Sequence, residues 1–211
     1  AQITFSRLRM SGNARGLAAA PVIKRRLTKE ARHRQLLDVA WNIVREEGSD
    51  ALTLGYLAER AGVTKPVVYD HFGTRTGLLG SLYKEYDSRQ HALLDAALKV
   101  CAKTLPAVAK VIAGSYVDCV MTMGREMPGV SAALTGSPEL EALKKEHEAL
   151  LLDKCRHALA PFAKKPLKLV AMRAMLGTAE AVSFAALAGE VDPIDAENEI
   201  YDAIRRITLR A

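Results

Sequence analysis

The chain has 211 residues, of which 49% are hydrophobic and 5% aromatic, and it carries a formal net charge of +6. It can therefore bury a substantial, mainly aliphatic core, as one domain or two small ones. Long alternating strand patterns are absent, and Gly and Pro fall at punctuating positions. We therefore expect an all-α fold of about nine helices.

The positive charge is confined to the N-terminal part of the chain. Residues 1–77 contain 13 Lys and Arg against 7 Asp and Glu, whereas residues 78–211 contain 17 of each kind. A basic module joined to a neutral one favours binding to phosphates through counterion release. Any interaction with nucleic acid should then belong to the N-terminal part.

The first 27 residues predict no long regular helix. No acidic residue precedes Glu30, whereas six Lys and Arg fall within the first 26 residues, Arg25 and Arg26 among them. We expect residues 1–27 to be a basic arm that approaches DNA. A transit peptide, or a leader before a natural start near Met10, are the alternatives.

Helical periodicity begins at Thr28, which we expect to cap a helix that ends at Gly48. The next 20 residues or so predict two short helices joined by a glycine turn at Gly62. Thr53 is suited to cap the first of them, and Thr64 the second. Such a pair forms a helix-turn-helix, whose second helix has the right size for a DNA major groove.

The rest of the chain predicts longer helices separated by Pro and Gly. They span approximately residues 75–101, 106–124, 138–160 and 167–189, with a last one from residue 193 onward. Leu150 and Ile194 are placed on inward faces. Charged residues such as Glu180 interrupt the apolar segment 167–189, which favours a buried helix over a membrane span.

Three cysteines indicate the compartment. Cys101, Cys119 and Cys155 are odd in number and widely spaced, which fits neither a disulfide framework nor a zinc site. We therefore expect reduced thiols in a cytoplasmic protein.

The N-terminal residues resemble the tetracycline-repressor (TetR) family of transcriptional regulators. The resemblance covers roughly residues 28–86 and is most specific over residues 61–72, followed by Leu78 and Leu79. Beyond Tyr86 only length and helix count agree. We accordingly assign residues 28–77 to a DNA-binding head and residues 78–211 to ligand binding and dimerisation.

The resemblance implies which side chains face DNA. Lys65 would point into the groove, Tyr69 would contact the backbone, and Arg75 would grip a phosphate. Asp70 departs from the family pattern, and either accepts from a cytosine amine or is only a solvated carboxylate. The expected DNA-binding residues are Thr53, Thr64, Lys65, Pro66, Val67, Tyr69, Asp70, His71 and Arg75, with Arg25 and Arg26 in the arm.

The inward positions of the C-terminal helices are rich in methionine and contain few polar side chains. This composition favours a pocket for a hydrophobic ligand, although an ordinary core would use the same residues. Glu180 leaves open a cationic ligand. The expected ligand-binding residues are Tyr116, Cys119, Met123, Met127, His147, Leu151, Met172, Met175 and Glu180. A stripe of small residues would let a second copy approach. The expected dimer interface contains Ala174, Gly177, Ala181, Phe184, Ala185 and Ile204.

These expectations combine into a homodimeric repressor that binds a palindromic operator in double-stranded DNA and leaves it when a small molecule binds. We expect no cofactor, no metal and no membrane partner. A redox-responsive regulator that uses Cys101 or Cys119 is one alternative. An enzyme is another, which the absence of a nucleophile–base pair, phosphate loop or metal set disfavours. A structural nucleic-acid protein is disfavoured by the large neutral C-terminal part.

Overall fold

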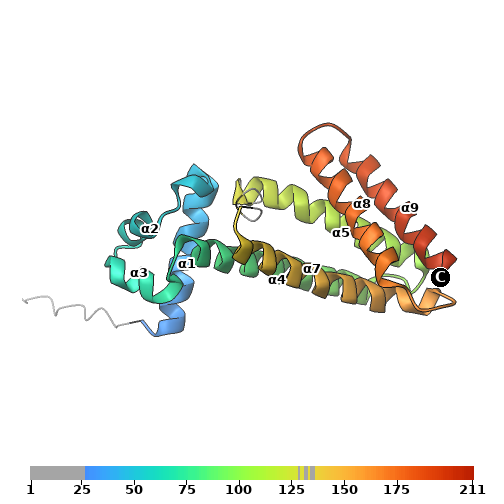
Figure 1. Ribbon diagram of the computed structural model, residues 1–211, viewed down its shortest axis with the longest axis horizontal. Helices are drawn as coiled ribbons and strands as arrows, with labels where there is room; N and C mark the ends of the chain where they lie inside the picture. Colours follow the sequence, from blue (N-terminus) through green and yellow to red (C-terminus); the bar gives the residue numbers. More distant parts are fainter. Residues whose placement is uncertain (1–26, 128, 131–132, 134–135) are drawn as a thin grey trace, which may run out of the picture.

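The structure is a computed structural model and describes residues 27–127, 129–130, 133 and 136–211. These residues contain eight α-helices, two 3-10 helices and no strand (Figure 1). The predicted all-α class is confirmed, and the described α-helices number eight where about nine were expected.

Four elements form the N-terminal head: α1 (Lys29–Glu47), the 3-10 helix η1 (Ser49–Ala51), α2 (Leu54–Arg60) and α3 (Lys65–Phe72). The Thr28 hydroxyl accepts from the Ala31 N–H at 3.2 Å, which confirms the predicted cap of α1. The Thr53 hydroxyl likewise accepts from the Tyr56 N–H at 3.1 Å at the start of α2. Gly62, with φ of 64°, has the left-handed conformation expected in the turn before α3.

The C-terminal body consists of α4 (Arg75–Val100), α5 (Leu105–Glu126), α7 (Pro138–Leu159), the 3-10 helix η2 (Ala160–Phe162), α8 (Leu169–Leu187) and α9 (Pro193–Arg210). α4 leaves the head and runs along the body with α7 beside it, while α5, α8 and α9 pack against one another (Figure 1). Prolines stand in the first turns of α5, α7 and α9, where a missing N–H leaves no hydrogen bond unmade.

Two hydrophobic cores hold the molecule together, and the first of them crosses the predicted domain boundary at residue 77. Beside the apolar faces of α1, α2 and α3, it contains Met123 and Met127 from the end of α5, together with Val130 and Leu140. The second core joins α5, α8 and α9 to the C-terminal half of α7. The head is therefore packed into the body.

A close contact at the junction fixes how the head meets the body. Gly129, in the turn after α5, has φ of 79°, and a Cβ there would lie 2.5 Å from the Ser49 Oγ of η1. Only glycine fits both the backbone conformation and the narrow space. The junction therefore depends on a residue that carries no side chain.

Two helix faces were predicted wrongly. Leu150 of α7 is 54% exposed and Ile194 of α9 is 67% exposed, although both were placed inward. Adjacent positions on a helix point about 100° apart, so the apolar character of one residue does not fix the face on which it lies. The helices α5 and α8 are long and apolar enough to cross a membrane, but both contribute to the second core, as helices of a globular domain do.

Candidate functional site

The outer face of α3 presents the side chains predicted to contact DNA. Val68 and Phe72 anchor α3 in the first core, which turns the opposite side of the helix outward. Tyr69 is 52% exposed. Thr64, Lys65, Pro66 and Asp70 are exposed, and Val67 and His71 are half-buried. The structure thus brings most of the predicted set to one helix face.

The residues that precede α3 position this face. Thr64 is the N-cap residue of α3, but its hydroxyl makes no capping hydrogen bond. That hydroxyl is consequently available to another acceptor or donor. The stem of Lys65 lies over Gly55 of α2, because a Cβ at Gly55 would be 3.6 Å from the Lys65 Cε.

His71 faces α1. Its ring lies 5.5 Å from the ring of His33 and 6.2 Å from that of Phe72, measured between centroids. Burial, followed by the neighbouring His33 and Lys29, holds the pKa of His71 below its ordinary value. At neutral pH this imidazole is therefore uncharged.

Arg75 makes contacts that the sequence did not predict. Its Nε donates to the Leu52 carbonyl at 2.9 Å, and its Nη2 donates to the Ser49 carbonyl at 2.7 Å. Asp50 lies 3.7 Å from the same Nη2. The guanidinium therefore ties the start of α4 to η1, and this role stands beside the predicted phosphate contact. Thr53 caps α2 as described above, and Arg25 and Arg26 lie outside the described residues.

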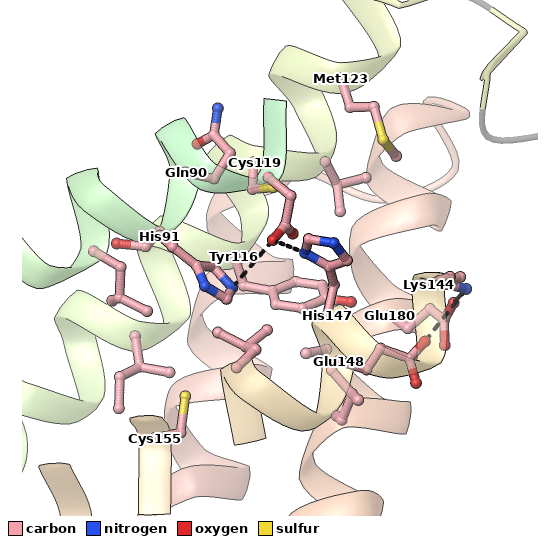
Figure 2. A pocket seen from close by; sticks show the side chains of 18 of the residues that line it. Gln90, His91, Tyr116, Cys119, Met123, Lys144, His147, Glu148, Cys155 and Glu180 are labelled. Carbon is pink, nitrogen blue, oxygen red and sulfur yellow. Dashed lines mark hydrogen bonds and ion pairs between the residues drawn. The ribbon is translucent and has the colours of Figure 1, made fainter. Parts of the chain in front are cut away.

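A cavity of about 120 Å³ lies between α4, α5, α7 and α8 (Figure 2). Seven of the predicted ligand-binding residues line it: Tyr116, Cys119, Met123, His147, Leu151, Met175 and Glu180. Met127 and Met172 do not line this cavity, since each is only 1% exposed within a core, Met127 in the first and Met172 in the second. A methionine pattern cannot separate a cavity lining from a close-packed interior.

The sequence did not predict the polar cluster at the centre of the cavity. Asp87 of α4 is hydrogen-bonded to Nδ1 of His147 and lies 3.6 Å from Nε2 of His91. Figure 2 shows His91 and His147 converging on this carboxylate from different helices. The spacing of Asp87 and His91 by one helical turn was the available signal.

Glu180 has a partner of opposite charge. The Lys144 Nζ donates to the Glu180 Oε1 at 2.5 Å and lies 3.6 Å from Glu148, which also pairs with Arg173 at 3.0 Å. Burial opposes the charge of Lys144, but these carboxylates outweigh it and raise the pKa of Lys144. The ion pairs connect α7 to α8 at one wall of the cavity.

Burial favours the protonated form of the two thiols that line the cavity. Burial raises the pKa of Cys119 to about 11 and that of Cys155 to about 12. Since the thiolate is the reactive species, this shift disfavours redox sensing by Cys119, one of the two cysteines named for it. Among the described residues, no group of three or more His, Cys, Asp or Glu could hold a metal ion.

The predicted dimer stripe on α8 is only partly open to a partner. Ala174, Gly177 and Ala181 are exposed, and a Cβ at Gly177 would meet nothing within 4 Å. Ala185 and Phe184 are half-buried, and Phe184 also lines the cavity. Ile204 is not open to a partner in this structure, because it is fully buried in the second core of its own chain.

The head matches a known family of proteins. Residues 36–90 match the model of the family described as bacterial regulatory proteins, tetR family. The nucleoid occlusion factor SlmA of Mannheimia succiniciproducens is 25% identical over 134 residues, which are 63% of this chain and 60% of SlmA. SlmA of Haemophilus influenzae is 23% identical over 116 residues, 55% of this chain and 51% of that protein. The chain thus spans about half to three fifths of the curated relatives it matches.

Solved structures share the whole fold at low identity. A TetR-family transcriptional regulator from Rhodococcus sp., described as putative in its name, superposes with a TM-score of 0.66 at 18% identity and covers 84% of this chain and 98% of its own. The fatty acid degradation regulator FadR of Bacillus halodurans gives a TM-score of 0.65 at 17% identity, over 82% of this chain and 94% of its own. At such identities the likeness extends to the fold alone.

Proposed function

Because the chain belongs to the tetR family of bacterial regulatory proteins and is a helix-turn-helix DNA-binding regulator of transcription, we propose that it is a homodimeric repressor. In this proposal a small molecule releases the protein from a palindromic operator. One observation carries the proposal. The outer face of α3 is exposed, and the cavity in the body shares wall residues with the first core, which also contains the head helices.

DNA recognition would use the outer face of α3. Lys65 is exposed there and can reach a base edge or a phosphate, and Tyr69 offers a phenol to the backbone. Two such heads on a symmetric dimer would read two half-sites in successive turns of the major groove. The excess of 13 basic over 7 acidic residues in positions 1–77 supports the electrostatic part of the binding.

Ligand binding would reach the head through a shared wall. Tyr83, Tyr86 and Met123 line the cavity and are also members of the first core, which contains the head helices. Tyr86 fixes this wall, because its hydroxyl donates to the Cys119 carbonyl at 2.5 Å. A ligand that displaces these side chains changes the packing against α1, and the required coupling is typically about 1–3 kcal/mol.

The effector would be small and hydrophobic or cationic, as the lining indicates. Three carboxylates line the cavity, namely those of Asp87, Glu148 and Glu180, against the single ammonium of Lys144. An anionic ligand would therefore enter a site with unfavourable charge. The exposed small residues of α8 support dimerisation through that helix, and reduced thiols agree with a cytoplasmic protein.

A defined operator and its release test the proposal. Purified protein should protect one palindromic site upstream of a gene that it regulates, with an affinity at least 1,000-fold above that for unrelated DNA, as is usual for specific binding. Adding a metabolite extract should abolish the protection. Binding of equal strength to all sequences would contradict a repressor and would favour the structural nucleic-acid protein.

A further inference from the structure

Tyr83 lines the cavity, and its hydroxyl has no hydrogen-bond partner among the described residues. This residue belongs to α4 and is only 9% exposed. Burial, followed by the nearby Asp87, raises the pKa of this phenol. The Tyr83 oxygen is not one of the fully buried unpaired polar atoms, which are the Ser183 Oγ and the Arg205 Nε, so it stays open to a ligand or to water.

His147 packs against the ring of Tyr83 and offers the complementary group. Its ring makes an edge-on contact with the Tyr83 ring, with centroids 5.4 Å apart. Asp87 accepts a hydrogen bond from Nδ1 of His147, since an ionised carboxylate is an acceptor only. In the neutral imidazole, Nε2 then carries the lone pair and accepts hydrogen bonds. It has no partner among the described residues.

The remaining residues that line the cavity are suited to packing against an aromatic ring of a ligand. The cavity is lined by the aromatic residues Tyr86, Tyr116 and Phe184 together with Met123 and Met175. Sulfur packs favourably against aromatic rings. The volume of about 120 Å³ is comparable to that of an apolar cavity of about 150 Å³ that holds benzene.

The charged groups of the cavity are already paired. Lys144 is held by Glu180 and Glu148, and Asp87 is held by His91 and His147. A ligand carboxylate would have to displace Glu180 from Lys144, and a ligand ammonium would have to displace a histidine from Asp87. A neutral ligand leaves both arrangements intact.

We infer that the effector is a small neutral phenol, whose hydroxyl donates to Nε2 of His147 and accepts from the hydroxyl of Tyr83. A phenol has one donor and two lone pairs on the same oxygen, so a single group satisfies both side chains. Its ring takes the place of the missing apolar contacts in the cavity. This inference rests on the proposed function, because it names the ligand of the same cavity.

Calorimetric titration of the purified full chain with a matched set of para-methyl benzenes tests the inference. The set is p-cresol, toluene, 4-methylanisole, 4-methylbenzoate and 4-methylbenzylammonium, which differ in charge and in the ability to donate. p-Cresol should bind roughly tenfold tighter than toluene or 4-methylanisole, since neither of these can donate a hydrogen bond to Nε2 of His147. Equal affinity of p-cresol and toluene, tighter binding of either ion, or no binding of p-cresol would overturn it.

Two variants locate the binding, with controls outside the cavity. Tyr83→Phe and His147→Leu should each reduce the affinity for p-cresol roughly tenfold and leave that for toluene unchanged. Tyr201→Phe and His157→Leu are matched controls, because Tyr201 packs under Arg205 and His157 is exposed on α7. Should a cavity variant not fold, the compound series on the natural chain still decides. If the protein binds DNA sequence-specifically and phenols do not release it, the phenol inference is refuted and the proposed repressor function stands. If p-cresol binds but no specific DNA binding is found, the proposed repressor function is refuted and the phenol inference stands.

Discussion

Replacing Arg75 separates its contacts within the protein from any contact with DNA. In the structure the guanidinium donates to the carbonyls of Leu52 and Ser49 at 2.9 and 2.7 Å. Hydrogen bonds that involve a charged group contribute about 1.5–3 kcal/mol each. The Arg75 side chain is 42% exposed, so water competes for both bonds. We therefore expect Arg75→Ala to lower the free energy of unfolding by about 2 kcal/mol in total.

The matching thermal shift follows from the size of the chain. For a domain of about 150–250 residues, 1 kcal/mol corresponds to roughly 2–4 °C, so the melting temperature should fall by about 4–8 °C. Differential scanning calorimetry measures it directly. The melting temperature of Arg75→Lys should fall by nearly as much, because an ammonium cannot donate to two divergent carbonyls in the way that a guanidinium does.

DNA titrations on the same proteins, well below their melting temperatures, complete the test. If Arg75 also grips a phosphate, Arg75→Lys should retain most of the operator affinity that Arg75→Ala loses. Lys65→Ala is the control, since Lys65 makes no ion pair within the described residues and should leave the melting temperature unchanged. An Arg75→Ala protein as stable as the natural chain would refute the reasoning on the carbonyl contacts.

Four further results are expected. Lys65→Ala should reduce the binding free energy for the preferred operator by about 1–3 kcal/mol and relax base preference, whereas Tyr69→Phe should weaken binding to all operators alike. Unchanged operator affinities of both variants would contradict the assignment of the outer α3 face to DNA binding. Deleting residues 1–27 should reduce the salt dependence of binding by about one unit for each lost phosphate contact, and an identical slope would show a passive segment. Gly177→Arg should produce folded monomers without operator binding, and a variant still dimeric in sedimentation would point to another interface. Because the pKa of His71 is lowered on folding, the unfolded chain binds this proton more readily, so stability should fall as the pH drops below about 6.5. His71→Gln should flatten that loss in urea melts at acidic pH, and an unchanged pH dependence would assign it to other groups.

The head could be predicted from the sequence because its determinants are local. A cap such as Thr28 or Thr53 acts on an N–H three residues away, and the left-handed Gly62 acts on its own turn. Short-range signals of this kind specify helix ends and the side of α3 that faces outward. Three of the longer C-terminal helices, α5, α7 and α9, were located for the same reason, by prolines in their first turns.

The chemistry of the cavity could not be predicted because its partners are distant in sequence. Asp87 and His147 are 60 residues apart, and Lys144 and Glu180 are 36 apart. Nothing in either segment specifies which helix the other will face. Met123 and Met127 lie one helical turn apart on α5, yet only Met123 reaches the cavity, since the difference is set by the packing of the head.

Because the first core continues from the head into α5 and α7, the head of this protein is not an interchangeable part. A chimera that joins residues 28–77 to the body of a relative would leave the apolar underside of the head facing side chains other than Met123, Met127, Val130 and Leu140. A new DNA specificity could then be acquired by changing the exposed face of α3, but not by exchanging the head. Descendants of this sequence would be expected to diverge in operator by point substitution, while the two halves change together.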